Sequence, residues 1–451
     1  MKVKISDWAW LPLEEFSTQK LVRLKDRLTV HPRKTSVHQD VPPEPIELFK
    51  VKDDLIGVPR SFFVQQNKLS EREHEVIVET SSGRPVDLKF KGELKEDQKQ
   101  CLACVLNDRG SGSFGGIVQA KPGWGKTVAG LAVWSAFNTS AIVLVQKQFL
   151  VDQWIERIGE FMPGARVGRI QQDKCEYGED FDISVGMLQT IVSRADSYPE
   201  DLWHAFGLQL TDETHRVGAP TWSQVVPSFT AGYRLGLSAT PRRKDGADDV
   251  FLQHIGPIIF RSKVNMVTPR VRRIFTGFVA VKTRTFELDK MSKQIQIQHI
   301  CKSPDRNRLI VKEIGGAVGA GRKVMVLSER RKHLELLKEK FDAGKKAECV
   351  TDFYVGGMKQ EELDEAAKAD VLFCTYQMTK EALDIPALDT VFLTTPVSDV
   401  EQAVGRIMRV YEGKKQPIIT DFIDESLSRF AKLWNTRRLF YVKEGMFEAK
   451  K

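Results

Sequence analysis

Cysteine is scarce in this sequence of 451 residues, and its six copies show none of the spacings of a disulfide framework. Cys101 and Cys104 have zinc-ligand spacing, but no second cysteine pair or nearby histidine pair completes a zinc site. The sequence therefore predicts a protein of the reducing cytosol that needs no disulfide or structural zinc.

Long apolar runs are also absent. No stretch of eighteen or more residues is apolar, and the N-terminus lacks the pattern of a signal peptide. We expect a cytoplasmic protein that has no membrane partner. The sequence shows no solenoid repeat and no low-complexity tract, so its length predicts two or three folded domains.

Acidic residues are outnumbered by basic ones. The sequence has 68 Lys and Arg against 60 Asp and Glu, which gives a net charge of +8 and a pI near 9.0. Residues 261–310 carry most of this excess, with twelve basic and three acidic residues. This distribution favours a polyanionic partner.

Residues 1–92 differ in pattern from the rest. Short alternating segments indicate strands, and a short basic stretch at 19–28 indicates a helix. We therefore predict a small, mostly β accessory domain, a candidate for binding DNA, at residues 1–92. Its expected strands are 48–51, 55–59, 75–79 and 86–90.

From residue 93 the pattern becomes strand–helix alternation in two series. Continuous apolar runs such as 141–145 are typical of buried parallel strands. Two such series predict an α/β fold with two parallel-sheet domains. We expect the first at 93–262 and the second at 263–451, which includes a basic linker and a C-terminal helix.

Residues 120–127 form a Gly-rich turn between an expected strand and an expected helix. Backbone N–H groups at such a helix start stabilise phosphate. Lys126 would reach the β- and γ-phosphates, and the Thr127 hydroxyl would hold Mg²⁺. Ala120 replaces the first glycine of the usual pattern.

An acidic pair follows the expected strand at 207–210. Beside a phosphate-binding turn, Asp212 would orient Mg²⁺ and Glu213 would accept a proton from the attacking water. The alternative is an ordinary helix start with acidic residues near its dipole.

Two later motifs complete the set. Ser238 and Thr240 lie at the end of the next expected strand, where an ordinary polar turn is the alternative. Arg406 and Arg409 are three residues apart, so a helix would present both on one face, either to a γ-phosphate or to solvent.

The order of these motifs resembles that of superfamily 2 helicases of the DExH type, over residues 93 to about 424. The resemblance implies two RecA-like domains in tandem that use ATP and Mg²⁺ and move along nucleic acid. Residues 94–98 are similar to the family's adenine-reading element. Residues 373–386 are similar to its motif V, with Ala382 where the family usually has glycine.

The resemblance assigns a role to each matching residue. Lys126, Asp212, Glu213, Arg406 and Arg409 are the implied catalytic residues, with Thr127 and Asp212 at Mg²⁺. The implied ATP contacts are Gln98, Gly123, Trp124, Gly125, Lys126, Thr127 and Asp384. The residues implied to couple the domains are His215, Ser238, Thr240 and Gln402. The expected DNA contacts are Gln146, Thr190 and Thr375, together with the basic cluster Arg270, Arg272 and Arg273.

Within the superfamily, the sequence is most similar to the XPB and UvsW group, through residues 55–60 and 305–308. This similarity implies an ATP-dependent DNA helicase that unwinds or branch-migrates forked and junction DNA. We expect it to act as a monomer on DNA and, if phage-encoded, in the host cytoplasm. A double-stranded DNA translocase, an RNA helicase and a nucleotide-switched binding protein remain open alternatives.

Overall fold

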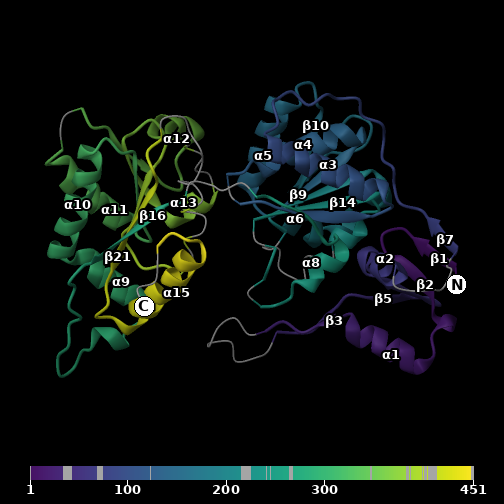
Figure 1. Cartoon of the computed structure of the whole chain (residues 1–451), viewed down its shortest axis with the longest axis horizontal. Helices are drawn as coiled ribbons and strands as arrows, with labels where there is room; N and C mark the ends of the chain where they lie inside the picture. The colour runs from purple at the N-terminus through teal and green to yellow at the C-terminus, as the bar shows by residue number, and fades with distance from the viewer. Residues whose placement is uncertain are drawn as a thin grey trace. The chain divides into compact units, whose positions relative to one another are not determined.

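The computed structural model shows two compact units, Met1–Val264 and Asn265–Lys451 (Figure 1). We describe each unit by itself. The residues described are 2–33, 43–68, 75–121, 123–214, 225–239, 241–243, 245–263, 268–345, 348–381, 385, 387–398, 400, 404 and 414–447.

The first unit begins with a five-stranded sheet of order β5-β6-β2-β1-β7. Its pairs are antiparallel except for β1 and β7, which run parallel. The strands are β1 (Lys2–Ile5), β2 (Ala9–Pro12), β5 (Lys50–Lys52), β6 (Leu55–Val58) and β7 (Glu75–Val78). They are accompanied by α1 (Thr18–Arg27), α2 (Arg60–Lys68) and the pair β3 (Thr29–Val30) and β4 (Ile46–Glu47).

An eight-stranded sheet of order β11-β10-β12-β9-β13-β14-β8-β15 forms the rest of the first unit. Its pairs are parallel except for β10 with β11, so the carboxyl ends of the parallel strands share one edge. The strands are β8 (Gly115–Gln119), β9 (Ala141–Val145), β10 (Val167–Gln171), β11 (Lys174–Cys175), β12 (Ile183–Met187), β13 (Leu208–Asp212), β14 (Tyr233–Ser238) and β15 (Ile258–Arg261).

Helices cover both faces of this sheet (Figure 1). One face packs against α3 (Glu96–Gly110), α4 (Lys126–Phe137) and α5 (Gln148–Phe161). The other packs against α6 (Leu188–Ser193) and α8 (Asp249–His254). This second core continues into the N-terminal sheet, since Val3 and Phe62 belong to the same apolar cluster as Phe251. The accessory residues are thus built into the first unit.

Two buried arginines join the N-terminal region to the eight-stranded sheet. Arg60 donates to the carbonyl oxygens of Ala231, at 2.8 Å, and Phe229, at 3.3 Å. Arg234 donates to the Asp7 carbonyl oxygen at 3.0 Å. Burial lowers the pKa of Arg60 to about 9, because a guanidinium charge is costly away from water. Carbonyl oxygens compensate that cost here.

The strand predicted at residues 86–90 is wrong. The Val86 N–H donates to the Asn138 carbonyl at 3.1 Å, and the Phe90 N–H donates to the Ser135 hydroxyl at 3.0 Å. The segment is thus bonded to the end of α4 and the residue after it. Its alternating apolar side chains pack on the core beneath α4, which explains why the sequence resembled a strand.

The second unit contains a six-stranded sheet of order β16-β21-β20-β17-β19-β18, whose described strand pairs all run parallel. Its strands are β16 (Arg270–Phe275), β17 (Val324–Ser328), β18 (Thr351–Tyr354), β19 (Val371–Thr375), β20 (Thr390–Leu393) and β21 (Ile418–Ile423).

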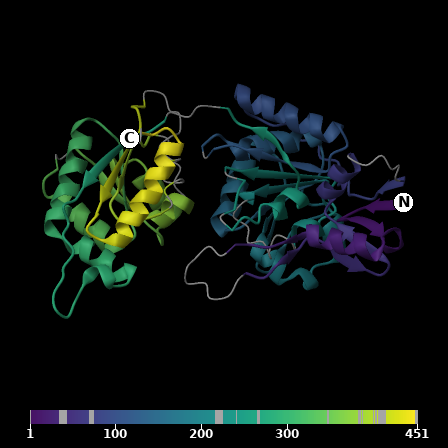
Figure 2. The same ribbon diagram turned by 60° about the horizontal axis from the view of Figure 1, so that its bottom comes forward.

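Helices again cover both faces of this sheet. One apolar cluster contains α10 (Pro304–Gly319) and α11 (Arg331–Asp342). The other contains α12 (Gln360–Ala366), α13 (Tyr376–Glu381) and α15 (Ser428–Lys443). Figure 2 shows α15, in yellow, lying across the sheet. The predicted fold class, two parallel-sheet α/β domains after a small, mostly β region, is confirmed.

The sequence suggested that the basic segment 261–310 is a linker, but the structure shows that it forms regular elements of the second unit. It contributes the edge strand β16, then α9 (Lys293–Lys302) and the first turns of α10. Within it, buried Arg306 donates to both carboxylate oxygens of Asp424, at 2.8 and 3.0 Å. Part of the positive charge therefore belongs to the core of the second unit.

Among the described residues, we find no helix that is both long and apolar enough to cross a membrane.

Candidate nucleotide-binding site

The predicted phosphate loop lies between β8 and α4, at the edge where the parallel strands end. Gly123 and Gly125 have φ values of 85° and 96°, a conformation that glycine adopts without strain. Ala120 has no such positive φ, and its N–H donates to the Ser238 carbonyl at 2.9 Å. The backbone at position 120 therefore does not require the glycine that the usual pattern has there.

The first turn of α3 holds the loop through two side chains. The Gln98 amide donates to the carbonyl oxygens of Trp124 at 3.1 Å and Gly125 at 3.4 Å, and it accepts from the Lys95 N–H. The neighbouring Asp97 carboxylate accepts the Trp124 indole N–H at 2.6 Å. Gln98 therefore bonds to the loop itself in this structure, and adenine reading by Gln98 stays a prediction.

Trp124 anchors the loop in the core. Its side chain is 5% exposed, and its ring centroid lies 5.9 Å from that of Phe260. The oxygen of Asp97 that accepts its indole N–H also accepts the Ser262 hydroxyl at 2.7 Å. One carboxylate thus joins the phosphate loop to the chain that follows β15.

The two predicted chemical groups meet at the loop. Lys126 Nζ lies 3.5 Å from Glu213 Oε1 and donates to the Ala120 carbonyl at 3.3 Å. Glu213 has a φ of 46°, which is uncommon for a residue with a side chain. Such backbone outliers concentrate at functional sites. The structure brings together Lys126 and Glu213 from segments 87 positions apart.

Asp212 is buried beside this pair. Its carboxylate accepts the Trp154 indole N–H at 2.9 Å and the Glu213 N–H at 2.8 Å. Burial, and then the charge of Glu213, raise the pKa of Asp212 above its ordinary value. Two adjacent carboxylates with Lys126 as their neighbouring cation favour a further positive charge, so oxygen donors at Asp212 and Thr127 fit Mg²⁺.

The other predicted residues that the structure describes differ in position and burial. The Gln146 amide donates to the Glu213 carbonyl at 3.0 Å, so this expected DNA contact adjoins the catalytic pair. Ser238 and Thr190 are both buried, at the end of β14 and within α6. Thr375 ends β19 in the second unit.

The arginine cluster 270–273 divides between the two faces of β16, because side chains alternate along a strand. Arg272 pairs with Glu313 at 3.0 Å, and the Arg273 guanidinium lies 5.5 Å from the Phe447 ring centroid. Arg270 is exposed. DNA contact by this cluster stays a prediction.

Several predicted residues lie outside the part of the chain that the structure describes, and their roles stay predictions. These are His215, Thr240, Asp384, Gln402, Arg406 and Arg409.

Two functional neighbours escaped the sequence analysis. Asp97 and Trp154 orient the loop and Asp212, but they lie 27 and 58 positions from the groups they bond. The signal available was the position of Asp97 immediately before Gln98 in the expected adenine-reading element. Trp154 had no such signal, because a buried helix tryptophan usually indicates packing alone.

Comparison with known proteins shows which families this chain resembles. Residues 91–243 match the family described as "Type III restriction enzyme, res subunit". The chain is 26% identical over 454 residues to L396 of Acanthamoeba polyphaga mimivirus, named as a candidate ATP-dependent RNA helicase. That alignment covers 98% of this chain and 86% of L396.

A second relative is named for DNA. XPB2 of Sulfurisphaera tokodaii, a "DNA 3'-5' translocase", is 31% identical over 200 residues, which cover 43% of this chain and 42% of XPB2. Among solved structures, S. cerevisiae Dbp5 L327V bound to RNA and ADP BeF3 has a TM-score of 0.52 at 14% identity. That likeness covers 79% of this chain and 89% of Dbp5, and it concerns the fold.

Proposed function

Because this chain belongs to the superfamily 2 helicases, we propose that it is an ATP-dependent DNA helicase that unwinds or branch-migrates forked and junction DNA. The observation that carries this proposal is the Lys126–Glu213 pair, 3.5 Å apart at a phosphate loop with two left-handed glycines. A nucleotide-binding protein without turnover would not need a carboxylate at that position.

Each residue of the site has a proposed task. Lys126 would leave Glu213 to bind the γ-phosphate, which would free the Glu213 carboxylate to accept a proton from water. Thr127 and Asp212 would hold Mg²⁺, which supplies positive charge to the phosphates. Arg406 and Arg409, from the second domain, would stabilise charge on the γ-phosphate.

Residues 55–60 and 305–308 suggest the XPB and UvsW group, but they do not indicate which nucleic acid is the substrate. Arg60 is buried and bonds to Phe229 and Ala231, and Arg306 is buried and pairs with Asp424. Both side chains therefore act within the fold. The DNA substrate, its branching and a phage origin rest on similarity to that group.

An ATPase assay tests the proposal. We would compare turnover without nucleic acid and with single strands, duplex, a fork, a four-way junction and RNA. Stimulation by DNA, largest with branched DNA, is the expected result. Stimulation by RNA and not by DNA would overturn the choice of DNA.

An RNA helicase is the second candidate, because the relative that aligns over 98% of this chain is named for RNA. The same assay separates the two. A strand-displacement assay on forked DNA then distinguishes a helicase from a translocase that moves without separating strands.

A further inference from the structure

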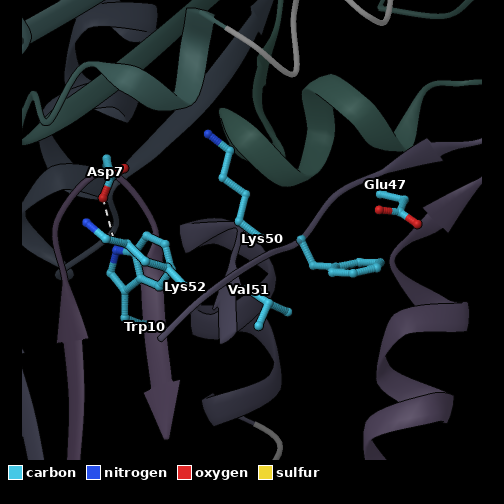
Figure 3. A pocket seen from close by; sticks show the side chains of 7 residues that line it. Asp7, Trp10, Glu47, Lys50, Val51 and Lys52 are labelled. Atoms are coloured by element: carbon cyan, nitrogen blue, oxygen red, sulfur yellow. Dashed lines mark hydrogen bonds between the residues drawn. The ribbon is translucent and has the colours of Figure 1, made fainter. Parts of the chain in front are cut away.

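The N-terminal sheet carries a hollow of about 490 Å³ that is distinct from the nucleotide site (Figure 3). Its lining comes from the turn before β2, from β2 itself and from residues 47–52. The lining side chains are Asp7, Trp10, Glu47, Phe49, Lys50, Val51 and Lys52. Two aromatic rings, two ammonium groups and two carboxylates therefore share one open surface.

Trp10 rests on a glycine in the neighbouring strand. Gly57 is its register partner, and a Cβ built on Gly57 would lie 2.9 to 3.1 Å from three carbons of the indole ring. Three ring atoms at nearly one distance mean that the ring lies flat over the Gly57 backbone. Trp10 also lines the hollow and is half-buried, so part of its ring is accessible there.

Asp7 fixes the orientation of this ring. The Trp10 indole N–H donates to Asp7 Oδ1 at 3.0 Å, drawn as the dashed line in Figure 3. The same oxygen accepts the Ser6 hydroxyl at 2.8 Å. A fixed ring loses little conformational freedom on binding, and its polar atom is already bonded. What remains for a ligand is the flat π surface.

Lysines lie on the same face of the sheet as this ring. Gly57 pairs in register with Trp10 on one side and with Lys50 on the other, so these side chains project to one face. Lys52, two positions along β5, shares that face. Lys50 Nζ also lies 5.3 Å from the Trp8 ring centroid, which helps to position it.

The combination of groups indicates the class of ligand. A flat ring with flanking ammonium groups suits a planar base joined to phosphates, as on single-strand binding surfaces. Of the two acids, Asp7 is occupied by the indole and Ser6, which leaves Glu47 at the other end of the lining. Duplex bases are already stacked on each other and cannot use such a platform.

We propose that this hollow binds one unpaired base of single-stranded DNA, stacked on Trp10, with adjacent phosphates on Lys50 and Lys52. The proposal rests on the proposed function in one respect, since DNA is the polymer on which the motor acts. It adds a contact that would hold a displaced or loading strand through the first unit.

Fluorescence anisotropy without nucleotide provides the test, using a labelled oligothymidylate. Trp10→Ala should weaken binding about 10- to 100-fold, the usual range for losing one stacked base. Trp10→Phe should restore most of the affinity, because phenylalanine also presents a flat ring. Blunt duplex DNA should bind wild type and Trp10→Ala alike.

The lysines have their own readout. Lys52→Ala should reduce the slope of log affinity against log salt by about 0.7, the value for one phosphate contact on a single strand. Lys20→Ala, which removes an exposed lysine of α1 outside the hollow, is the matched control and should leave the slope unchanged.

A cross-linking experiment guards against a misfolded variant. In wild-type protein, an oligonucleotide with one 5-iodouracil should cross-link to Trp10 on irradiation. Equal affinity of folded Trp10→Ala and wild type, or cross-links confined to other residues, would overturn the proposal.

The proposed function is read separately, from stimulation of ATP hydrolysis by the same oligonucleotide and by forked DNA. Normal stimulation with unchanged binding in Trp10→Ala rejects the hollow and keeps the helicase. Absent stimulation in the wild type rejects the helicase, while the affinities still decide the hollow.

Discussion

The phosphate loop and the N-terminal hollow each contain a tryptophan whose indole N–H is held by an aspartate. Trp124 donates to Asp97 at 2.6 Å, and Trp10 donates to Asp7 at 3.0 Å. Their surroundings differ. Trp124 is buried against Phe260, whereas Trp10 lies on Gly57 and lines an open hollow.

The difference shows that one hydrogen bond can serve two purposes. Around Trp124, where the ring is enclosed, the bond fixes a loop to the core. Around Trp10, which lines the hollow, the bond holds the ring in place for the proposed base. We therefore expect changes near the first tryptophan to alter turnover and stability, and changes near the second to alter strand binding.

The largest expected effect separates the two regions. Lys126→Ala should reduce ATP turnover about 10³-fold, because the γ-phosphate loses its charge partner. Single-strand binding without nucleotide should stay within about twofold of wild type, because the two sites share no residue and such sites usually act independently. Steady-state hydrolysis and anisotropy measure the two, with Lys99→Ala on α3 as the control. Loss of both activities together would contradict the division between regions.

Glu213→Gln should have the next largest effect, on the rate of ATP hydrolysis. Without a base for the attacking water, hydrolysis should slow about 10²-fold or more. Binding of a labelled ATP analogue in the presence of Mg²⁺ should persist, since Asp212, Thr127 and Lys126 remain. Hydrolysis at the wild-type rate would remove Glu213 from the role of base.

A pair of aspartate variants sharpens the comparison directly. Asp97→Ala leaves the buried Trp124 N–H without its acceptor and should lower the free energy of unfolding by about 1–3 kcal/mol. Asp7→Ala should lower it by less, because water can reach the half-buried Trp10. Chemical denaturation measures both. Equal losses would mean that Trp10 is as enclosed as Trp124.

The smallest expected effect is a pH dependence. Burial raises the pKa of Asp7, but the hydrogen bonds from Trp10 and Ser6 outweigh it and hold that pKa below its ordinary value. A carboxyl with a lowered pKa in the folded state contributes stability above the pKa of the unfolded chain, about 3.9. That contribution disappears as the pH falls through the lower, folded-state value.

Thermal unfolding from pH 5 downward tests this dependence. Below about pH 4, the wild-type midpoint should fall more steeply than that of Asp7→Asn, which cannot lose a charge. Parallel curves for the two proteins would show that Asp7 does not contribute in this way.

Much of the fold was predictable because buried parallel strands are continuous apolar runs. Residues 141–145 form β9 as expected, since each of these residues is buried. The edge strand Arg270–Phe275 was only the alternative interpretation of the basic cluster. Three of its six side chains are arginines, which suit the exposed edge of a sheet but mask the strand pattern.

The candidate site was predictable where it follows local motifs. Lys126 and Glu213 meet as the strand–turn–helix pattern implied, because both follow strand ends at one edge of a parallel sheet. The tryptophans were not predictable in the same way. Trp8 and Trp10 are two positions apart, yet Trp8 is 1% exposed and packs edge-on against His254, whereas the half-buried Trp10 lies on Gly57.

The carboxylate of Asp97 also has a mechanical consequence. It accepts hydrogen bonds from the Trp124 indole and from the Ser262 hydroxyl, and Ser262 lies three residues before Asn265, where the second unit begins. Tension applied along the chain at Ser262 therefore loads the same atom that restrains the phosphate loop. A pull on the chain at Ser262 and a shift of the phosphate loop therefore act on the same carboxylate oxygen, and two hydrogen bonds connect them.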